Sequence, residues 1–267
     1  MKYKAFQVQR DSHSPNVDEL RRGVPCGRFL VKIAITPDEL EAALRLRYRV
    51  FHDELNEGLA ANQGTGLDRD EFDPVCDHLL LIFDGQVVGT YRLLYGPRRP
   101  AVGFYSQSEF DLCGLPLDWD HGVELGRGCV APEFRKQSTL MTLFWGLNRY
   151  MRLRKARYLF GCASLPPMSS DDAEATFRRL LEMGRIDRDV DVQPHPSHAF
   201  EGDATKGHER IPPLLTLYLE FGARILGRPA YDAAFGCHDF FVVFDMDRLS
   251  HWGNELITRF DRRLGSV

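Results

Sequence analysis

The chain has 267 residues, enough for one large domain or two small ones, and its 43% hydrophobic and 27% charged residues are ordinary for a soluble globular enzyme. The net charge of −4 excludes a general attraction to nucleic acid, so any basic surface has to be local. No uncharged apolar run approaches the roughly 20 residues of a membrane span, and six dispersed cysteines without a CxxC pair predict a reduced, cytoplasmic chain with no structural zinc site.

The first part of the chain predicts an arm followed by a capped helix. Residues 1–29 have weak periodicity, and we interpret them as an N-terminal arm. Thr36 is a good N-cap, because Pro37 and Glu39 follow it at the first and third helical positions. Apolar residues then recur at helical spacing, so we expect an amphipathic helix that ends near 56–58 and a surface loop after it.

The middle of the chain predicts strands. Asp84-Gly85 separates two runs with strand character, 78–83 and 86–95, which is a strong hairpin signal. We expect further strands at 103–110, 122–130 and 158–163, and a long helix at 134–154.

The rest of the chain alternates helices with a strand. Helices are expected at 171–183, 211–226 and 247–260, and a strand at 240–244. Residues 184–210 are rich in Pro, His and Gly, which is typical of a lid-like loop. The order of elements predicts an α/β (α+β) fold with a mixed central sheet flanked by helices. We expect one domain over 30–267, with a helix and the loop inserted at 166–210.

One strand carries the residues that point most directly to chemistry. Glu124 lies in an apolar context, where burial raises the pKa of a carboxyl group and suits it to take a proton from an amine. The backbone amides of Cys129 and Val130, at the strand end, are placed to hold a thioester carbonyl. The next helix begins near Arg135 and Lys136, where its N-terminus is placed to hold a phosphate. This order suits an acyltransferase that uses thioesters.

Arg127 offers a second interpretation of the same strand. It would face the side opposite Glu124 in a regular strand, but a bulge at Gly126 or Gly128 would bring the two side chains together. Glu124 and Arg127 would then form an internal ion pair with no catalytic part.

The acidic run at 68–73 also allows two interpretations. Such a run is usually a solvated loop. Its functional interpretation is a recognition site for a cationic amine that includes Asp70 and Asp73. Arg47 and Arg92 would pair with these acids or hold a substrate carboxylate.

The segment from Phe134 to Arg157 is strongly basic and contains no acidic residue. Its seven cations are Arg135, Lys136, Arg149, Arg152, Arg154, Lys155 and Arg157. They form either a helix face balanced by acids elsewhere or a docking patch for an acidic carrier protein or for anionic lipid headgroups.

Several motifs in order carry a family resemblance. They are Arg47-Tyr48-Arg49-Val50-Phe51, Asp70-Glu71-Phe72-Asp73, Gly89-Thr90-Tyr91-Arg92-Leu93 and Glu124-Leu125-Gly126-Arg127. The series resembles the GNAT-fold acyltransferases related to acyl-homoserine lactone autoinducer synthases. Signature positions of those synthases fall on Arg47, Phe51, Asp70, Asp73, Arg92, Glu124 and Arg127. Their signature tryptophan has no counterpart around Glu57, which points away from an autoinducer product.

A closer resemblance, over about 30–245, is to the bacterial L-ornithine Nα-acyltransferases of ornithine lipid synthesis. It is carried by stretches within 71–80, 103–112, 158–164 and 211–230. It implies a GNAT fold and transfer of a long, often 3-hydroxylated, acyl chain from acyl carrier protein to the α-amine of an amino acid. L-Ornithine is the expected acceptor and lyso-ornithine lipid the expected product.

From this resemblance, together with the reasoning on the strand and the charges above, we expect the following roles for single residues. Glu124 is the catalytic residue, and the amino acid is bound by Arg47, Asp70, Asp73, Arg92 and Arg127. The donor is an acyl-phosphopantetheine, held by Cys129, Val130, Arg135, Lys136 and Ser138. The usual GNAT phosphate loop is replaced by Arg135–Thr139, which favours acyl carrier protein over CoA as the donor. No metal and no tightly bound cofactor are expected.

Other functions stay open at this point. One is an N-acyl amino acid or autoinducer-type synthase that uses another amine. Others are a non-catalytic acyl-carrier or lipid-binding protein and a membrane-associated haemolysin-like factor. Expected partners are acyl carrier protein, the amino acid and, peripherally, the inner-membrane surface.

Overall fold

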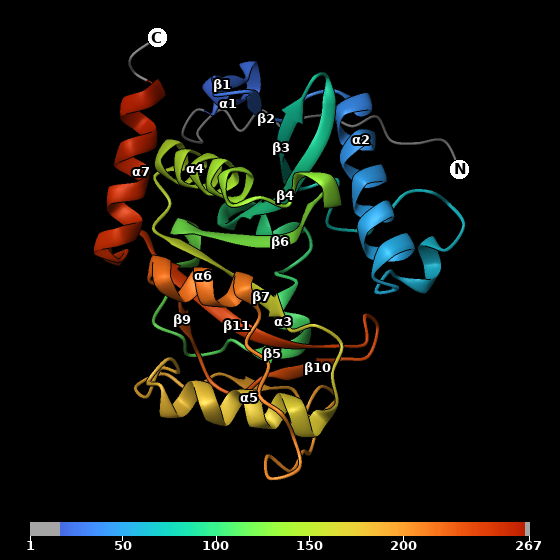
Figure 1. Ribbon diagram of the computed structural model, residues 1–267, viewed down its shortest axis with the longest axis vertical. Coiled ribbons are helices and arrows are strands. Elements are labelled where there is room, and N and C mark those ends of the chain that lie inside the picture. Colours follow the sequence, from blue (N-terminus) through green and yellow to red (C-terminus); the bar gives the residue numbers. More distant parts are fainter. Residues whose placement is uncertain (1–16, 265–267) are drawn as a thin grey trace. The chain divides into compact units, whose positions relative to one another are not determined.

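The computed structural model describes residues 17–264, and these residues group into two compact units. Of the described residues, unit 1 contains 17–102, 125–156 and 257–264. Unit 2 contains residues 103–124 and 157–256. The chain passes between the two units four times. One domain over 30–267, with an insertion at 166–210, stays a prediction. Figure 1 labels the elements.

Unit 1 is built on an antiparallel sheet of consecutive strands with helices packed against it. The strands are β1 (Val24–Cys26), β2 (Phe29–Ile33), β3 (Asp77–Phe83) and β4 (Gln86–Tyr95), and each pairs with the next. The helices are α1 (Asp18–Arg22), α2 (Pro37–Tyr48), a π-helix (Arg49–Glu54) and α4 (Gln137–Arg154). Residues 17–29, expected to be part of an arm, therefore include α1 and β1, while residues 1–16 lie outside the described part.

The helix cap and the tight turn that the sequence predicts in unit 1 are both present. Thr36 and Glu39 form a capping box at the start of α2, because each side chain bonds the backbone of the other residue. Asp84 and Gly85 both have positive φ, as a tight turn between two strands requires. The hairpin β3–β4 is thereby confirmed.

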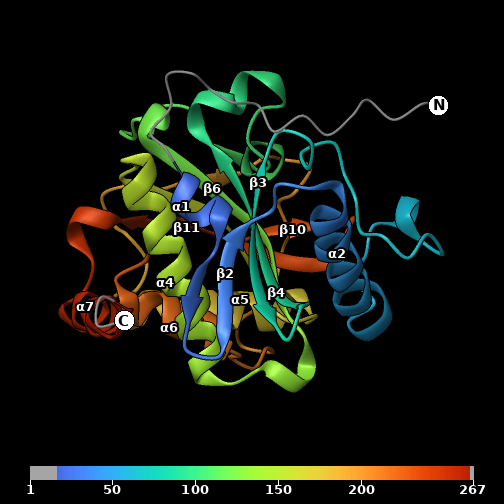
Figure 2. The ribbon, with the colours of Figure 1, turned by 90° about the horizontal axis from the view of Figure 1, so that it is seen from above.

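Helices cover both faces of the unit 1 sheet. In Figure 2, α2 lies on one side of β2–β4 and α4 on the other. The approach of α4 is close, because a Cβ atom at Gly146 would lie 2.8 Å from a methyl carbon of Val31. Apolar residues of α4 that include Leu143, Leu147 and Met151 fill this layer.

Unit 2 has strand pairings of its own. β6 (Gly122–Val130) begins here and runs parallel to β7 (Tyr158–Ser164), which is antiparallel to β11 (Cys237–Asp245). β11 also pairs with β9 (Arg224–Ile225) and β10 (Ala230–Asp232), while β5 (Phe110–Asp111) pairs with β8 (Gln193–Pro194). The helices are α3 (Ser106–Glu109), α5 (Ser170–Glu182), α6 (Pro213–Phe221) and α7 (His251–Leu264), which continues into unit 1. Parallel and antiparallel pairs together make the mixed sheet that the sequence predicts.

Two predicted elements of unit 2 were wrong. Residues 103–110 do not form a third strand but turn into the short helix α3, because a carboxylate binds the amides at its start. The helix predicted over 211–226 ends at Phe221, because Gly222 adopts a left-handed C-cap with φ of 105°.

The long loop 184–210 is tied to the helices beside it. His195 N–H donates to the carbonyl of Glu109 at 2.8 Å, and Arg210 N–H donates to the hydroxyl of Thr176 at 2.9 Å. Backbone groups of this loop are therefore anchored on α3 and α5. Within residues 17–264, every helix is too short or too polar to cross a membrane.

Candidate active site

A cluster of buried ion pairs in unit 1 brings together five of the residues that the sequence assigned to the substrate. At its centre Arg47, on the last turn of α2, is fully buried. Its guanidinium donates to Asp68 Oδ1 from Nε at 2.8 Å and from Nη2 at 2.6 Å, and to Asp73 Oδ1 from Nη1 at 2.6 Å. Asp68 and Asp73 are therefore folded inward around an arginine, while Arg69 and Glu71 of the same run are exposed.

The second part of this cluster is built around Arg92 of β4. Arg92 forms an ion pair with Asp70 and lies 3.5 Å from Asp73. Its guanidinium also lies over the ring of Phe72, 5.1 Å from the centroid. Asp70 N–H donates to Asp73 Oδ2 at 2.9 Å, which fixes the loop between the two acids.

Arg127 completes the cluster from the middle of β6. It pairs with Asp68, and its guanidinium lies 4.9 Å from the centroid of Phe51 in the π-helix. Its backbone φ of 49° is left-handed, so the strand is irregular at Arg127 itself, between the two glycines where we expected a bulge. Three arginines thus face three aspartates, and we call this set the charged cluster: Arg47, Arg92, Arg127, Asp68, Asp70 and Asp73.

The electrostatics of the charged cluster keep Asp73 ionised. Burial alone would raise the pKa of Asp73, but the guanidinium charges of Arg47 and Arg92 outweigh it and hold that pKa well below its ordinary value. Burial lowers the pKa of Arg127, and the charges of Arg47 and Arg92 lower it further, against the pull of Asp68.

Glu124, the predicted base, is held by the start of α3 in unit 2. Its carboxylate is buried and accepts three hydrogen bonds: from Tyr105 N–H at 2.8 Å, Ser106 N–H at 2.7 Å and the Ser106 hydroxyl at 2.7 Å. These donors fix the orientation of the carboxylate. The parallel pairing of β6 with β7 reaches its last pair at Glu124 and Phe160.

The predicted donor site occupies the end of β6 and the start of α4. Burial raises the pKa of the Cys129 thiol to about 12, so the thiol stays protonated and is a poor nucleophile. Arg135 donates to the Val130 carbonyl at 3.0 Å and pairs with Glu54, while Lys136 is the exposed N-cap residue of α4. Ser138 lies in the first turn of that helix, and its carbonyl accepts from the Thr142 hydroxyl.

Comparisons with known proteins place this arrangement in a family. A family model described as an acetyltransferase (GNAT) domain matches residues 46–145. The L-ornithine N(alpha)-acyltransferase of Brucella abortus (strain 2308) is 34% identical over 268 residues, covering 92% of this chain and 94% of that protein. The protein of the same name from Agrobacterium fabrum is 32% identical, covering 86% of each chain. The chain belongs to this acyltransferase family.

A solved structure of similar fold is that of a CoA-dependent acyl-homoserine lactone synthase, BjaI. It has a TM-score of 0.50 and 17% identity, covering 86% of this chain and 83% of that one. The GNAT fold and the family resemblance predicted from the sequence are confirmed.

Most of the basic segment in this family member is balanced by acids of the same chain. Arg149 pairs with Glu19, Arg152 with Asp261, Arg154 with Asp77 and Arg157 with Asp245. Lys136 and Lys155 are exposed, and no ion pair of either lysine occurs within residues 17–264.

Two groups of buried acids were not identified from the sequence. Asp68 was treated only as part of the acidic run, although two arginines converge on it. Three buried acids of unit 2, Glu109, Asp232 and Asp239, were not singled out, because they are far apart in the sequence and have no motif in common. Their separation of up to 130 residues leaves no local signal.

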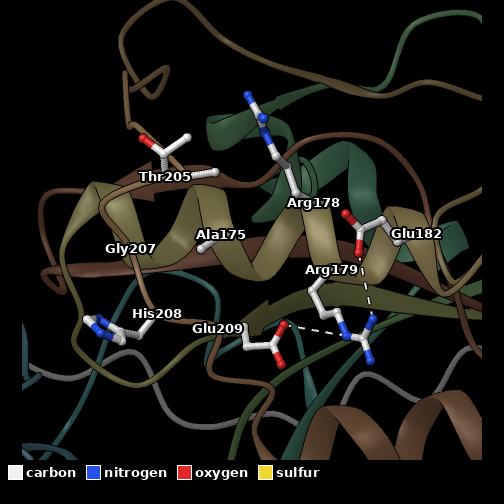
Figure 3. A pocket seen from close by; sticks show the side chains of 9 residues that line it. Ala175, Arg178, Arg179, Glu182, Thr205, Gly207, His208 and Glu209 are labelled. Carbon is white, nitrogen blue, oxygen red and sulfur yellow. Dashed lines mark ion pairs between the residues drawn. The ribbon is translucent and has the colours of Figure 1, made fainter.

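A pocket over α5 in unit 2 has a different character. Figure 3 shows Arg178 and Arg179 on the helix and His208 and Glu209 on the loop that lines the other side. Arg179 lies 3.6 Å from Glu182 and 3.4 Å from Glu209, so its charge is compensated. The pocket includes none of the predicted site residues.

Proposed function

We propose that this acyltransferase moves a long, often 3-hydroxylated, acyl chain from a thioester donor to the α-amine of L-ornithine. The observation that carries the proposal is the 34% identity to an L-ornithine N(alpha)-acyltransferase along 92% of the chain. The product is then lyso-ornithine lipid.

The proposed chemistry is direct attack of the amine on the thioester, without an acyl-enzyme. Glu124 accepts the proton of the attacking amine, directly or through water, and its three hydrogen-bond donors keep the carboxylate aimed. The protonated thiol of Cys129 supports a path that needs no cysteine nucleophile.

The proposed position of the thioester carbonyl is based on the length of β6 between the base and the strand end. Glu124 and Cys129 are five residues apart, or about 16 Å along an extended strand. The carbonyl therefore has to lie nearer the irregular backbone of 126–128, and we assign Cys129 and Val130 to the pantetheine arm. The φ of Arg127 supports this, since a bulge turns peptide groups out of the regular ladder.

The charged cluster is proposed to form part of the amino-acid site and to supply its charged side chains. Asp70 is its most accessible acid, with 15% of the side chain exposed, and Arg92 is its partner. Because the arginines and aspartates already balance one another, the cluster acts chiefly by holding Asp70, Arg92 and Arg127 in position.

The donor is proposed to be acyl carrier protein, with Lys136, Ser138 and the α4 N-terminus near its phosphate. BjaI, of similar fold, is described as CoA-dependent and was solved with isopentyl-CoA, which supports phosphopantetheine donors in general. Peripheral contact with the inner-membrane surface also belongs to this proposal, supported by the exposed Leu214 on α6.

The proposal is tested by expressing the chain in a host that lacks ornithine lipids and analysing the lipids by mass spectrometry. We expect lyso-ornithine lipid to accumulate. Purified protein incubated with acyl carrier protein bearing a 3-hydroxyacyl chain and a panel of amino acids should acylate ornithine foremost. Acylation of a different amine, with ornithine unused, would refute the proposed acceptor.

The carrier assignment is tested by charge reversal at the exposed lysines. Lys136→Glu combined with Lys155→Glu should raise the KM for acyl carrier protein several-fold and leave the use of short acyl-CoA nearly unchanged. Lys206→Glu, on the loop of unit 2, is the control. Because Lys136 and Lys155 cap opposite ends of α4, equal effects on both donors would count against docking along this helix.

A further inference from the structure

Unit 2 contains a buried cluster of three carboxylates from three elements. Glu109 ends α3, Asp232 ends β10, and Asp239 lies in β11. One oxygen of each lies within 4.8 Å of the other two, and the exposed fractions are only 1%, 4% and 2%. We call these three residues the acidic triad.

The acidic triad lacks a positive partner. Asp232 accepts from the Tyr105 hydroxyl at 2.7 Å and from two backbone amides, and Asp239 faces the thiol of Cys237. Both carboxyl oxygens of Glu109 are buried, and among residues 17–264 no donor meets hydrogen-bond geometry with them, although the Cys162 thiol and the Asp239 carboxyl group lie close by. Within residues 17–264, none of the three forms an ion pair with an arginine, lysine or histidine. By contrast Glu174, another buried acid of unit 2, pairs with Arg228.

The geometry of the acidic triad suits a primary ammonium group. An ammonium offers three N–H donors, one for each carboxylate. Because the three oxygens lie within 4.8 Å of one another, a nitrogen placed between them would be at most about 2.8 Å from each in their plane, which is within reach of such hydrogen bonds. Magnesium or calcium needs six or more oxygen ligands, whereas the other side chains nearby include the thiols of Cys162 and Cys237.

We propose that the acidic triad binds the side-chain ammonium of the amino-acid substrate, the δ-ammonium of L-ornithine. This rests on the proposed function and names the subsite that selects a diamino acid. Glu109 is a buried carboxyl group that faces the two other buried carboxyl groups of the triad. Together the three groups can accept the three N–H donors of an ammonium ion.

The acidic triad also lies at a suitable spacing from the proposed base. Ser106 donates to Glu124 and stands one helical turn before Glu109 on α3. Residues three apart on a helix have Cβ atoms about 5–6 Å apart. The two nitrogens of extended ornithine are separated by about 6 Å, since five bonds join them. The usual Cβ spacing of residues placed like Ser106 and Glu109 is therefore similar to the distance from the α-amine to the δ-ammonium.

The protonation of the acidic triad is consistent with an exchangeable cation. Burial raises the pKa of Glu109, and the charges of Asp239 and Asp232 raise it further. Burial also raises the pKa of Asp239. The titratable groups facing Glu109 are Tyr105, Cys162, Asp232, Cys237 and Asp239. A proton held in the empty triad would be released when an ammonium enters.

The kinetic test compares L-ornithine with L-norvaline, which has the same carbon chain without the δ-ammonium. Asp239→Asn should raise the KM for ornithine about 10- to 100-fold, the effect of one lost charged hydrogen bond, and leave norvaline kinetics unchanged. Glu109→Gln is the second variant if Asp239→Asn does not fold, and the exposed Asp111→Asn is the matched control. Equal losses on both substrates would show a structural role only and overturn the proposal.

Calorimetry without an acyl donor separates this proposal from the proposed function. The wild type should bind ornithine at least tenfold more tightly than norvaline, with release of a proton, and Asp239→Asn should abolish the difference. Selective binding of ornithine without acylation would refute the proposed function but support ammonium binding by the acidic triad. Acylation of ornithine with no preference over norvaline would refute the triad alone. Tight binding of Mg²⁺ or Ca²⁺ that excludes ornithine would also overturn it.

Discussion

Asp68 is the residue on which the charged cluster depends. It is fully buried, and it accepts hydrogen bonds from Arg47 on α2 and Arg127 on β6. A buried ion pair adds little net stability relative to an apolar replacement, but removing one partner leaves the other charge uncompensated. Asp68 therefore joins two elements by a contact that is costly to break.

Asp68→Asn should lower the free energy of unfolding by about 3–5 kcal/mol, because Arg47 and Arg127 would lose a buried counter-charge. Asp53→Asn, an exposed acid on the π-helix, should change it by less than about 0.5 kcal/mol. Urea unfolding of the three proteins measures both values. Similar stability of the two variants would contradict the role given to Asp68.

Glu124→Gln should reduce turnover by roughly 10²- to 10⁴-fold, the usual contribution of a general base. Because the amide would face donors from Tyr105 and Ser106, the melting temperature has to be measured alongside. Ser106→Ala removes one donor but keeps the carboxylate, so its loss of turnover should be much smaller. A folded Glu124→Gln protein with near-normal turnover would end the assignment of the base.

At the scale of elements, β6 combines three features that a regular strand cannot combine. It carries Glu124 as its third residue, turns irregular at Arg127 and ends in the buried Cys129 and Val130. Gly128 follows the irregular residue, and a Cβ atom there would lie 2.0 Å from Cε1 of Tyr91. The glycines flanking Arg127 therefore have different roles, since a Cβ atom at Gly126 would meet its nearest neighbour at 3.8 Å.

Gly128→Ala should lower the free energy of unfolding by about 1–3 kcal/mol, the cost of forcing a side chain into a filled space. Gly126→Ala is the matched control two residues away and should be nearly neutral. Thermal unfolding compares the two variants with the wild type. Equal stability of both variants would show that the Tyr91 ring moves aside freely.

The short helix α3 is an element that local sequence patterns do not predict. Residues 103–110 have the aromatic composition of a strand, and their local pattern predicts one. Their amides at Tyr105 and Ser106 instead bind Glu124, which is 18 or 19 residues away. A tertiary hydrogen bond thus overrides the local preference, and the same turn brings Glu109 to the acidic triad.

At the scale of the whole molecule, charge is balanced mainly within the chain. Arginines of the basic segment pair with acids of distant elements, so the local excess of positive charge contributes less to the surface than the sequence indicated. Asp77 is the most buried of these partners, and it accepts from Arg154 at 2.7 Å and from the Tyr150 hydroxyl at 2.7 Å.

Stability should fall in acid through Asp77. Burial raises its pKa, but Arg98 and Arg154 outweigh burial and lower the pKa to about 2, below the ordinary 3.8. The folded state is therefore favoured above about pH 4, and this contribution of about 2 kcal/mol is lost as the pH falls from about 4 to about 2. Urea unfolding between pH 2 and 6 measures the slope. Asp77→Asn should flatten it, and an unchanged slope would contradict the assignment.

The sequence by itself determined the capped helix α2, the turn at Asp84-Gly85 and the strand β6, because caps, turns and alternation are local properties. Motif order was also enough to identify the family and to select Arg47, Asp70, Asp73, Arg92 and Arg127. Only the tertiary structure decided which charges meet. Asp68 is 59 residues from Arg127, and only packing brings the two together as an ion pair. Asp239 is 130 residues from Glu109, and packing brings these two acids together with no cation among residues 17–264 between them.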